Sequence, residues 1–217
     1  MTSPSGPSIQ QFAGELLAAR NQLSEECLRM LKVVQQRCPG LLPTQPLPPG
    51  TPGTEIPLNP DEVQKLVTVA AATAAGAAEG ADTVVWTASG SELLVIVAKV
   101  FVRLGRGFVV VTIPVSCDQV QGAQIEVGFA VGDESRPAGL LAVTEDRPRG
   151  PAAVVDIWGD ALTAYAWQVV CTVTGGVAGA AGEDQDGAPL IPVALSASPD
   201  GLRVLPMARH PFDRIPR

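Results

Sequence analysis

The sequence predicts an α+β fold in which an antiparallel β-meander sheet packs against helices, with a long N-terminal amphipathic helix on a Pro-rich linker. Apolar residues first recur every three or four positions, a segment with seven prolines follows, and apolar and polar residues then alternate along segments joined by short turns. We therefore divide the chain into a helical extension (1–38), a linker (39–58) and an α+β domain (59–217).

The first element expected is a helix over residues 9–38, which Ser8 can cap and Pro39-Gly40 ends. Its apolar stripe needs a cover, because helical stability in proteins comes mostly from packing such a face. Either the core of the same chain or a partner helix can supply that cover, and the pattern leaves both open. The stripe consists of Ile9, Phe12, Leu16, Ala19, Leu23, Cys27, Met30 and Val34.

The prolines of residues 39–58 favour extended backbone and forbid a helix. This segment is a spacer or a strap pinned on the surface. Its PxxP-like spacing also suits a proline-reading partner domain, but connectors of this composition are common. We expect a second helix from Asn59 to about Ala78, because Asn59 can cap it, Pro60 suits the first turn, and small residues in its second half allow close packing.

The meander is expected from alternating strands at 83–88, 92–104, 108–117 and 124–131. Pro114 lacks an N–H, so its strand should be an edge there or carry a bulge. The apolar face of the second strand is expected to hold Leu94, Ile96, Ala98, Val100, Val102 and Leu104. The remaining expected elements are strands at 139–143, 152–158, 190–195 and 202–205, a helix at 161–173, a flexible loop at 175–187 and an irregular basic tail at 206–217.

Composition excludes several classes of function. The net charge of −7 and pI near 4.7 argue against a general nucleic-acid binder and against docking on an anionic membrane. Four cysteines without a C-x-x-C pair, together with one histidine, cannot build a zinc pattern. We find no cofactor motif and no secretory signal, so the expectation is a cytoplasmic protein with reduced thiols and no cofactor or metal.

Four groups of residues are candidates for function. His210 with Asp213 could serve a nucleophile, although a surface or packing role is favoured, and residues 182–187 match a calcium loop only in part. Lys99, Arg103 and Arg106 could clamp an anion, or could simply line the wet face of the sheet. The aromatic residues could anchor an interface, line a ligand pocket or fill the core; they are Trp86, Trp158, Tyr165 and Trp167.

We therefore predict a non-enzymatic protein-interaction or assembly protein that is oligomeric through self-association or a larger assembly. The extra helix, the extended arm and the low charged fraction of 17% favour it. The alternative is a small-molecule-binding domain or an enzyme, with its site between sheet and helix near the aromatic residues.

Overall fold

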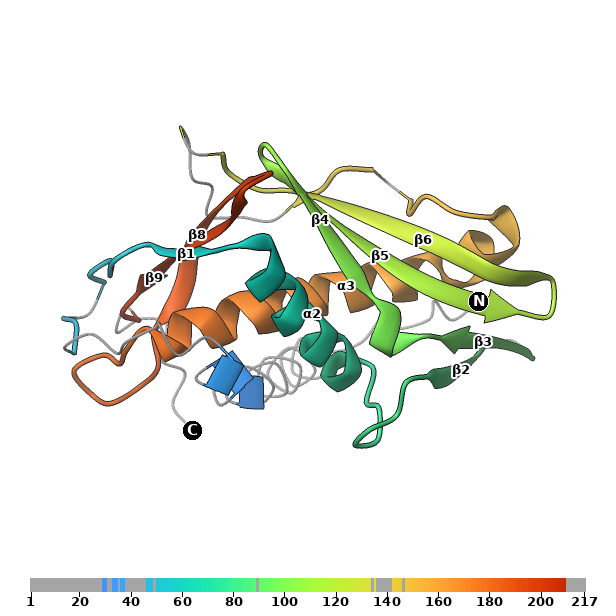
Figure 1. Cartoon of the computed structure of the whole chain (residues 1–217), viewed down its shortest axis with the longest axis horizontal. Coiled ribbons are helices and arrows are strands. Elements are labelled where there is room, and N and C mark those ends of the chain that lie inside the picture. Colours follow the sequence, from blue (N-terminus) through green and yellow to red (C-terminus); the bar gives the residue numbers. More distant parts are fainter. Residues whose placement is uncertain are drawn as a thin grey trace, which may run out of the picture.

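The computed structural model describes residues 29–30, 33–34, 36–37, 46–48, 50–88, 90–133, 135, 142–145 and 147–209. Over these ranges it contains two antiparallel sheets and two helices described in full, which confirms the α+β class (Figure 1). The larger sheet holds β2 (Val84–Ala88), β3 (Ser91–Val95), β4 (Phe101–Gly105), β5 (Phe108–Cys117), β6 (Val120–Ala130) and β7 (Ala142–Val143). The smaller holds β1 (Ile56–Leu58), β8 (Ile191–Ser198) and β9 (Gly201–Met207). The helices are α2 (Pro60–Ala74) and α3 (Ala152–Ala180).

Most of the predicted N-terminal helix lies outside the described residues, including Ile9, Phe12, Leu16 and Leu23 of its stripe. The described positions between 29 and 37 are helical, and Met30 and Val34 belong to the hydrophobic core. Met30 lies against α3, since a Cβ added to Gly176 would be 2.5 Å from its Cγ. At these two positions the chain's own core covers the stripe.

The described part of the Pro-rich segment is a strap on the domain. The backbone N–H of Leu47 donates to the carbonyl of Glu183 (3.1 Å), and that of Gly53 donates to Pro206 (2.8 Å). The segment then continues as β1, which pairs antiparallel with β9. Extended backbone, which prolines favour, is the conformation that a strand requires.

Helix α2 begins where the sequence predicts. The side chain of Asn59 accepts the backbone N–H of Glu62, and the Glu62 carboxylate accepts the N–H of Asn59, which completes a capping box. The helix ends at Ala74, four residues before the predicted end. Its small second half packs on α3, where Tyr165 donates a hydrogen bond to the carbonyl of Ala71.

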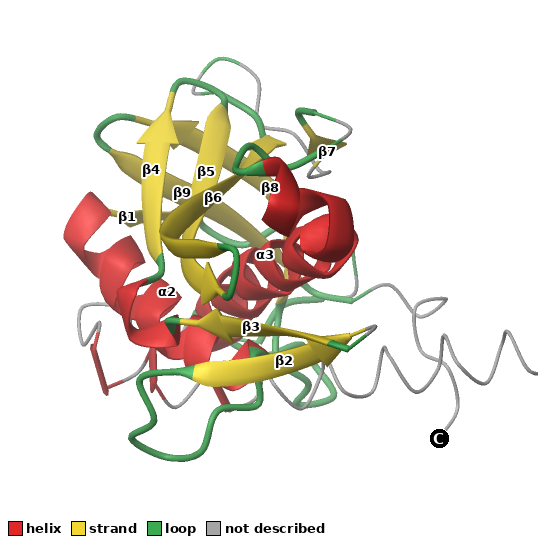
Figure 2. Cartoon of the chain, turned by 90° about the vertical axis from the view of Figure 1, so that its right-hand side faces the viewer, coloured by secondary structure: helices red, strands yellow, loops and turns green. Residues whose placement is uncertain are grey.

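The predicted strand over 92–104 is wrong as one element. It is divided into β3, a 3₁₀ turn (Val97–Lys99) and β4, and Figure 2 shows β2 and β3 turned away from β4, β5 and β6. The N–H of Ile96 donates to the carbonyl of Pro114, but Pro114 has no N–H to donate in return. The ladder between β3 and β5 stops beside this proline, and on the other side of β5 its pairing with β6 has a register shift between Val115 and Cys117.

As a consequence, the core-facing side chains are the odd-numbered residues in β3 and the even-numbered residues in β4. Leu93 and Val95 are fully buried in β3, whereas Leu94 and Ile96, the predicted core residues, are half-buried. The 3₁₀ turn then shifts the alternation by one residue, so that in β4 Val102 is half-buried on the inner side, as predicted. Strands β5 and β6 bury their predicted faces, with Val109, Val111, Ile113, Val115, Ile125, Val127 and Phe129 nearly inaccessible.

The C-terminal half needs a larger correction. Residues 152–158, predicted as a strand, and 175–180, predicted as a loop, are both part of α3. This helix is apolar on nearly all sides, so no single stripe with a 3.6-residue period marks it. It packs against α2, β6, β8 and β9 and extends from the large sheet to the small one (Figure 1). Strands β8 and β9 are confirmed and are longer than predicted.

Candidate functional site

Two of the four candidate aromatic residues lie in the core, and Trp86, which is half-buried, packs against it. Tyr165 and Trp158 are 4% and 5% exposed, and the Trp86 and Tyr165 rings meet edge to face with centroids 5.4 Å apart. The Tyr165 hydroxyl donates to Ala71 at 2.9 Å, and burial raises the pKa of this phenol. Tyr165 thus joins α3 to α2 and β2, and its hydroxyl is already used within the fold.

The fourth aromatic residue, Trp167, lies apart from this group. Its ring is in edge contact with Phe129 of β6 at 5.9 Å, yet the residue remains 41% exposed. Ile157, three turns earlier in α3, is 45% exposed. The sequence grouped Trp167 with Trp158 and Tyr165 because residues 152–158 were expected to form a strand; on one continuous helix, Trp158 and Trp167 are nine residues apart and lie on opposite sides.

Trp167 and Ile157 belong to one exposed side of α3. Residues 157, 160, 161, 164 and 167 follow one another at steps of three or one and share one side of a helix. All five are exposed. We call this surface the α3 face; it consists of Ile157, Asp160, Ala161, Ala164 and Trp167. A side chain with a negative charge occurs only toward its N-terminal end.

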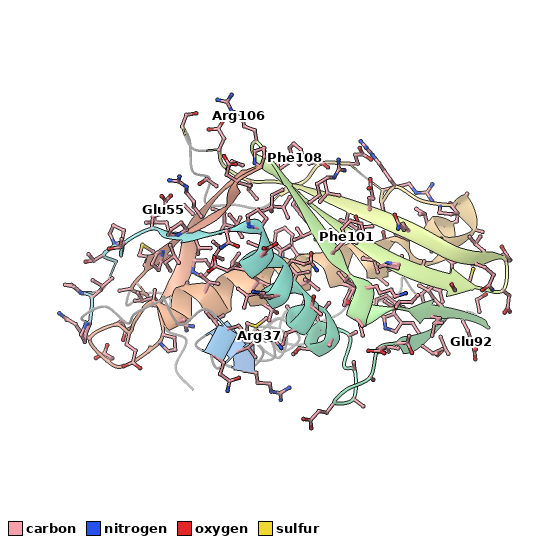
Figure 3. All side chains as sticks on the ribbon, viewed as in Figure 1. Arg37, Glu55, Glu92, Phe101, Arg106 and Phe108 are labelled. Carbon is pink, nitrogen blue, oxygen red and sulfur yellow. The ribbon has the colours of Figure 1, made fainter. Side chains whose placement is uncertain are left out.

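The three basic candidates do not form one clamp. Lys99 lies in the 3₁₀ turn before β4, whereas Arg106 lies in the turn after it, where it pairs with Asp133 at 3.7 Å. Figure 3 shows Arg106 at the tip of that turn, far from Phe101 at the start of β4. Arg103 lies between them on β4, with its Nη2 3.8 Å from Glu126.

Arg103 instead lines a pocket of about 330 Å³ with two arginines that the sequence reasoning missed, Arg147 and Arg149. The pocket lies between the outer side of β4–β6 and the segment that leads into α3. The signal that could have revealed it is the charged stretch 145–149, which the sequence treats only as a loop. We call this cavity the arginine pocket; it is lined by Arg103, Phe108, Val110, Glu126, Val127, Gly128, Thr144, Glu145, Arg147, Pro148, Arg149 and Thr163.

Backbone hydrogen bonds hold the outer wall of the arginine pocket. Thr144 N–H donates to the carbonyl of Gly128 at 2.9 Å, and Glu126 and Arg149 exchange two hydrogen bonds, each of 2.9 Å. A side chain at position 128 would collide with the Thr144 hydroxyl, so glycine permits this close approach. The wall thus follows the edge of β6 and brings Arg147 and Arg149 to the same pocket as Arg103.

Two of these arginines are held by acidic residues. Arg149 Nε donates to both carboxylate oxygens of Glu145 at 2.7 and 2.9 Å, and this bond raises the pKa of Arg149 and lowers the pKa of Glu145. Arg147 forms a hydrogen-bonded ion pair with Asp156 of α3. The pocket is therefore tied to α3 beside the α3 face, which begins one residue later at Ile157.

The remaining candidates from the sequence provide less evidence for a functional site. His210 and Asp213 lie outside the described residues. In the acidic loop, buried Asp184 accepts the backbone N–H groups of Asp186 and Ala188, which closes a turn. Within the described ranges, no three or more His, Cys, Asp or Glu side chains are grouped to hold a metal ion.

Helix α3 has the length and apolar composition of a membrane-crossing helix, but 61% of its most apolar window is buried inside the protein. A core helix has the same character.

No protein-family model, curated protein or solved structure matches the chain.

Proposed function

We propose that this chain is a non-enzymatic assembly protein that self-associates through the α3 face. The observation that carries the proposal is the exposure of Ile157 (45%) and Trp167 (41%) on a helix whose other sides are packed. Large aromatic side chains are enriched in the central parts of protein interfaces. Between them, Ala161 and Ala164 are small enough to let a second backbone approach closely.

A second copy of the chain fits the side of α3 that holds this face, because the two ends of that side differ. Ile157 at the N-terminal end is bulky and Asp160 is charged, whereas Cys171 and Gly175, which continue the side beyond Trp167, are small and uncharged. An antiparallel pair of α3 helices places Ile157 of each copy over the small residues of the other, with Trp167 between them. It also keeps the two copies of Asp160 apart, as a two-fold symmetric interface requires when like charges are present.

The N-terminal segment is a less suitable cover for this face. Its anchoring residue Met30 contacts α3 at Gly176, which is twelve residues after Ala164. At 3.6 residues per turn, these two positions lie ~120° apart around the helix axis. The Met30 contact is therefore on a different side of α3 and does not continue onto the α3 face.

Sedimentation velocity of the full chain over a range of concentrations tests the proposal. We expect the wild-type chain to associate, and Ile157→Asp to shift it to monomer, because a charge would be buried without a partner. Val85→Asp is the matched control, since Val85 is 53% exposed on β2, outside the α3 face. A wild-type chain that stays monomeric at every concentration, or an equal effect of both variants, contradicts self-association through α3.

We also propose that the assembly acts in the cytoplasm and binds neither nucleic acid nor membrane. The net charge of −7 supports the absence of binding, because nucleic acids and membrane surfaces are both anionic.

A further inference from the structure

The arginine pocket has the dimensions of a small-molecule site. Its volume of about 330 Å³ lies at the lower end of the range for ligand pockets, roughly 300–1,000 Å³. Two sides are fixed: the floor consists of strands β4–β6, and the outer wall is hydrogen-bonded to Gly128 and Glu126. Such a cavity suits a ligand of one ring and one polar group, and the side chains of the lining determine which polar group can bind.

Arg103 is the part of the lining that favours an anion. Three arginines and two glutamates line the pocket, and Asp156 beside it balances Arg147. Arg147 and Arg149 are engaged by hydrogen bonds to Asp156 and Glu145. Arg103 differs, because its 3.8 Å approach to Glu126 is too long for a hydrogen bond. Its guanidinium therefore retains N–H donors that a ligand oxygen can use in pairs.

The rest of the lining supplies an apolar surface. The Phe108 ring covers Gly105, since a Cβ added to that glycine would overlap the ring, and this contact fixes the aromatic side chain on the outer side of the sheet. Val110 and Pro148 add apolar atoms on the floor and the wall. A planar ring can thus lie against these side chains while its charged group reaches Arg103.

We propose that the arginine pocket binds a small monocarboxylate with a planar apolar body, whose carboxylate is held by Arg103. Glu126 competes with that ligand, because its carboxylate is the nearest negative charge to the same guanidinium. The side chain of Glu126 is not needed for the wall, since the wall is joined through its backbone N–H and carbonyl. Neutralising Glu126 therefore frees the site without removing its support.

The experiment is calorimetric titration of the full chain with benzoate, and with benzamide as the neutral probe of nearly equal shape. We expect benzoate to bind at least about tenfold more tightly than benzamide, since a charge-assisted hydrogen bond is roughly twice as strong as a neutral one. Arg103→Gln should weaken benzoate at least about tenfold, and Glu126→Gln should strengthen it several-fold.

Arg106→Gln is the control, because Arg106 pairs with Asp133 outside the pocket and its loss should leave benzoate binding unchanged. Thermal unfolding of each variant shows that the fold is intact. Equal affinity for benzoate and benzamide, no heat with benzoate at millimolar concentration, or weaker binding in Glu126→Gln would each overturn the proposal. These results do not depend on the oligomeric state, so they are separate from the test of self-association.

Discussion

Substitution of Gly176 by alanine tests whether the N-terminal region is anchored on α3. In an exposed helix this change stabilises, because alanine exceeds glycine in helix propensity by about 1 kcal/mol. Here the added Cβ would lie 2.5 Å from Met30 Cγ and 2.9 Å from Met30 Cβ, closer than carbon atoms can pack. Met30 is 2% exposed and has little room to move away.

The expected magnitude follows from these two opposed effects. Overpacking of a core by one methyl-sized group costs about 1–3 kcal/mol, so the net change is a loss of up to roughly 2 kcal/mol. Gly159→Ala is the matched control in the same helix. Its added Cβ meets only Val155 Cγ1 at 3.4 Å and Pro148 Cδ at 3.6 Å, which are ordinary contacts. Gly159→Ala should therefore stabilise by up to about 1 kcal/mol.

Urea unfolding and thermal unfolding of both variants measure the difference. We expect a gap in the free energy of unfolding of about 1–3 kcal/mol, or a Tm gap of roughly 3–10 °C for a domain of this size. The sign of the stability change in Gly176→Ala decides whether Met30 lies beside Gly176. If Gly176→Ala stabilises as much as Gly159→Ala does, Met30 does not occupy the space beside Gly176, and the anchoring of the N-terminal region on α3 is refuted.

Three further predictions concern the core, the cap of α2 and the pairing of β1 with β9. Tyr165→Phe should cost about 1 kcal/mol in urea unfolding through loss of the bond to Ala71. Burial raises the pKa of Tyr165, the chain's only tyrosine. The free energy of unfolding of the wild type should therefore fall as pH rises above about 10, where the phenol of the unfolded chain ionises, and Tyr165→Phe should flatten that decline. A parallel decline in both proteins would contradict the burial argument. Asn59→Ala should lower the free energy of unfolding by about 1 kcal/mol through loss of the capping box, and an unchanged Tm would contradict the cap. Gly201→Ala should destabilise by at least about 1–3 kcal/mol, because φ there is +153° and a Cβ would overlap the Leu58 carbonyl; a neutral result in thermal unfolding would show that β1 does not pair with β9.

Local patterns carried the prediction where one face of an element is buried. Strand β6 alternates from Ala123 to Ala130, β5 buries every second residue from Val109 to Val115 with Thr112 in addition, and the cap of α2 is encoded in the consecutive residues Asn59 to Glu62. The break at Val97–Lys99 could not be read from its own residues, which continue the alternation. Its cause lies in Pro114 on the neighbouring strand, and only the pairing brings the two together.

The candidate sites show the same division. Arg103 was recognised as a potential anion contact, but the sequence grouped it with neighbours on its own strand and the adjoining turns. Its partners in the structure, Arg147 and Arg149, are more than forty residues away and arrive beside it because their segment hydrogen-bonds to the edge of β6. Charge and residue type could be predicted, whereas their convergence depends on a strand-edge contact that has no local signature.

The lack of a clear polar side, which obscured α3 in the sequence, also supports the proposed assembly. A helix with one side in water is normally polar on that side, and this contrast produces the periodic pattern by which such helices are recognised. In α3 the contrast is weak because Ile157, Ala161, Ala164 and Trp167 are exposed, while Asp156 and Asp160 are its only charged residues. A second α3 would give the exposed apolar residues the same environment as the buried ones. The absence of a clear polar side is therefore what self-association through the α3 face predicts for the sequence itself.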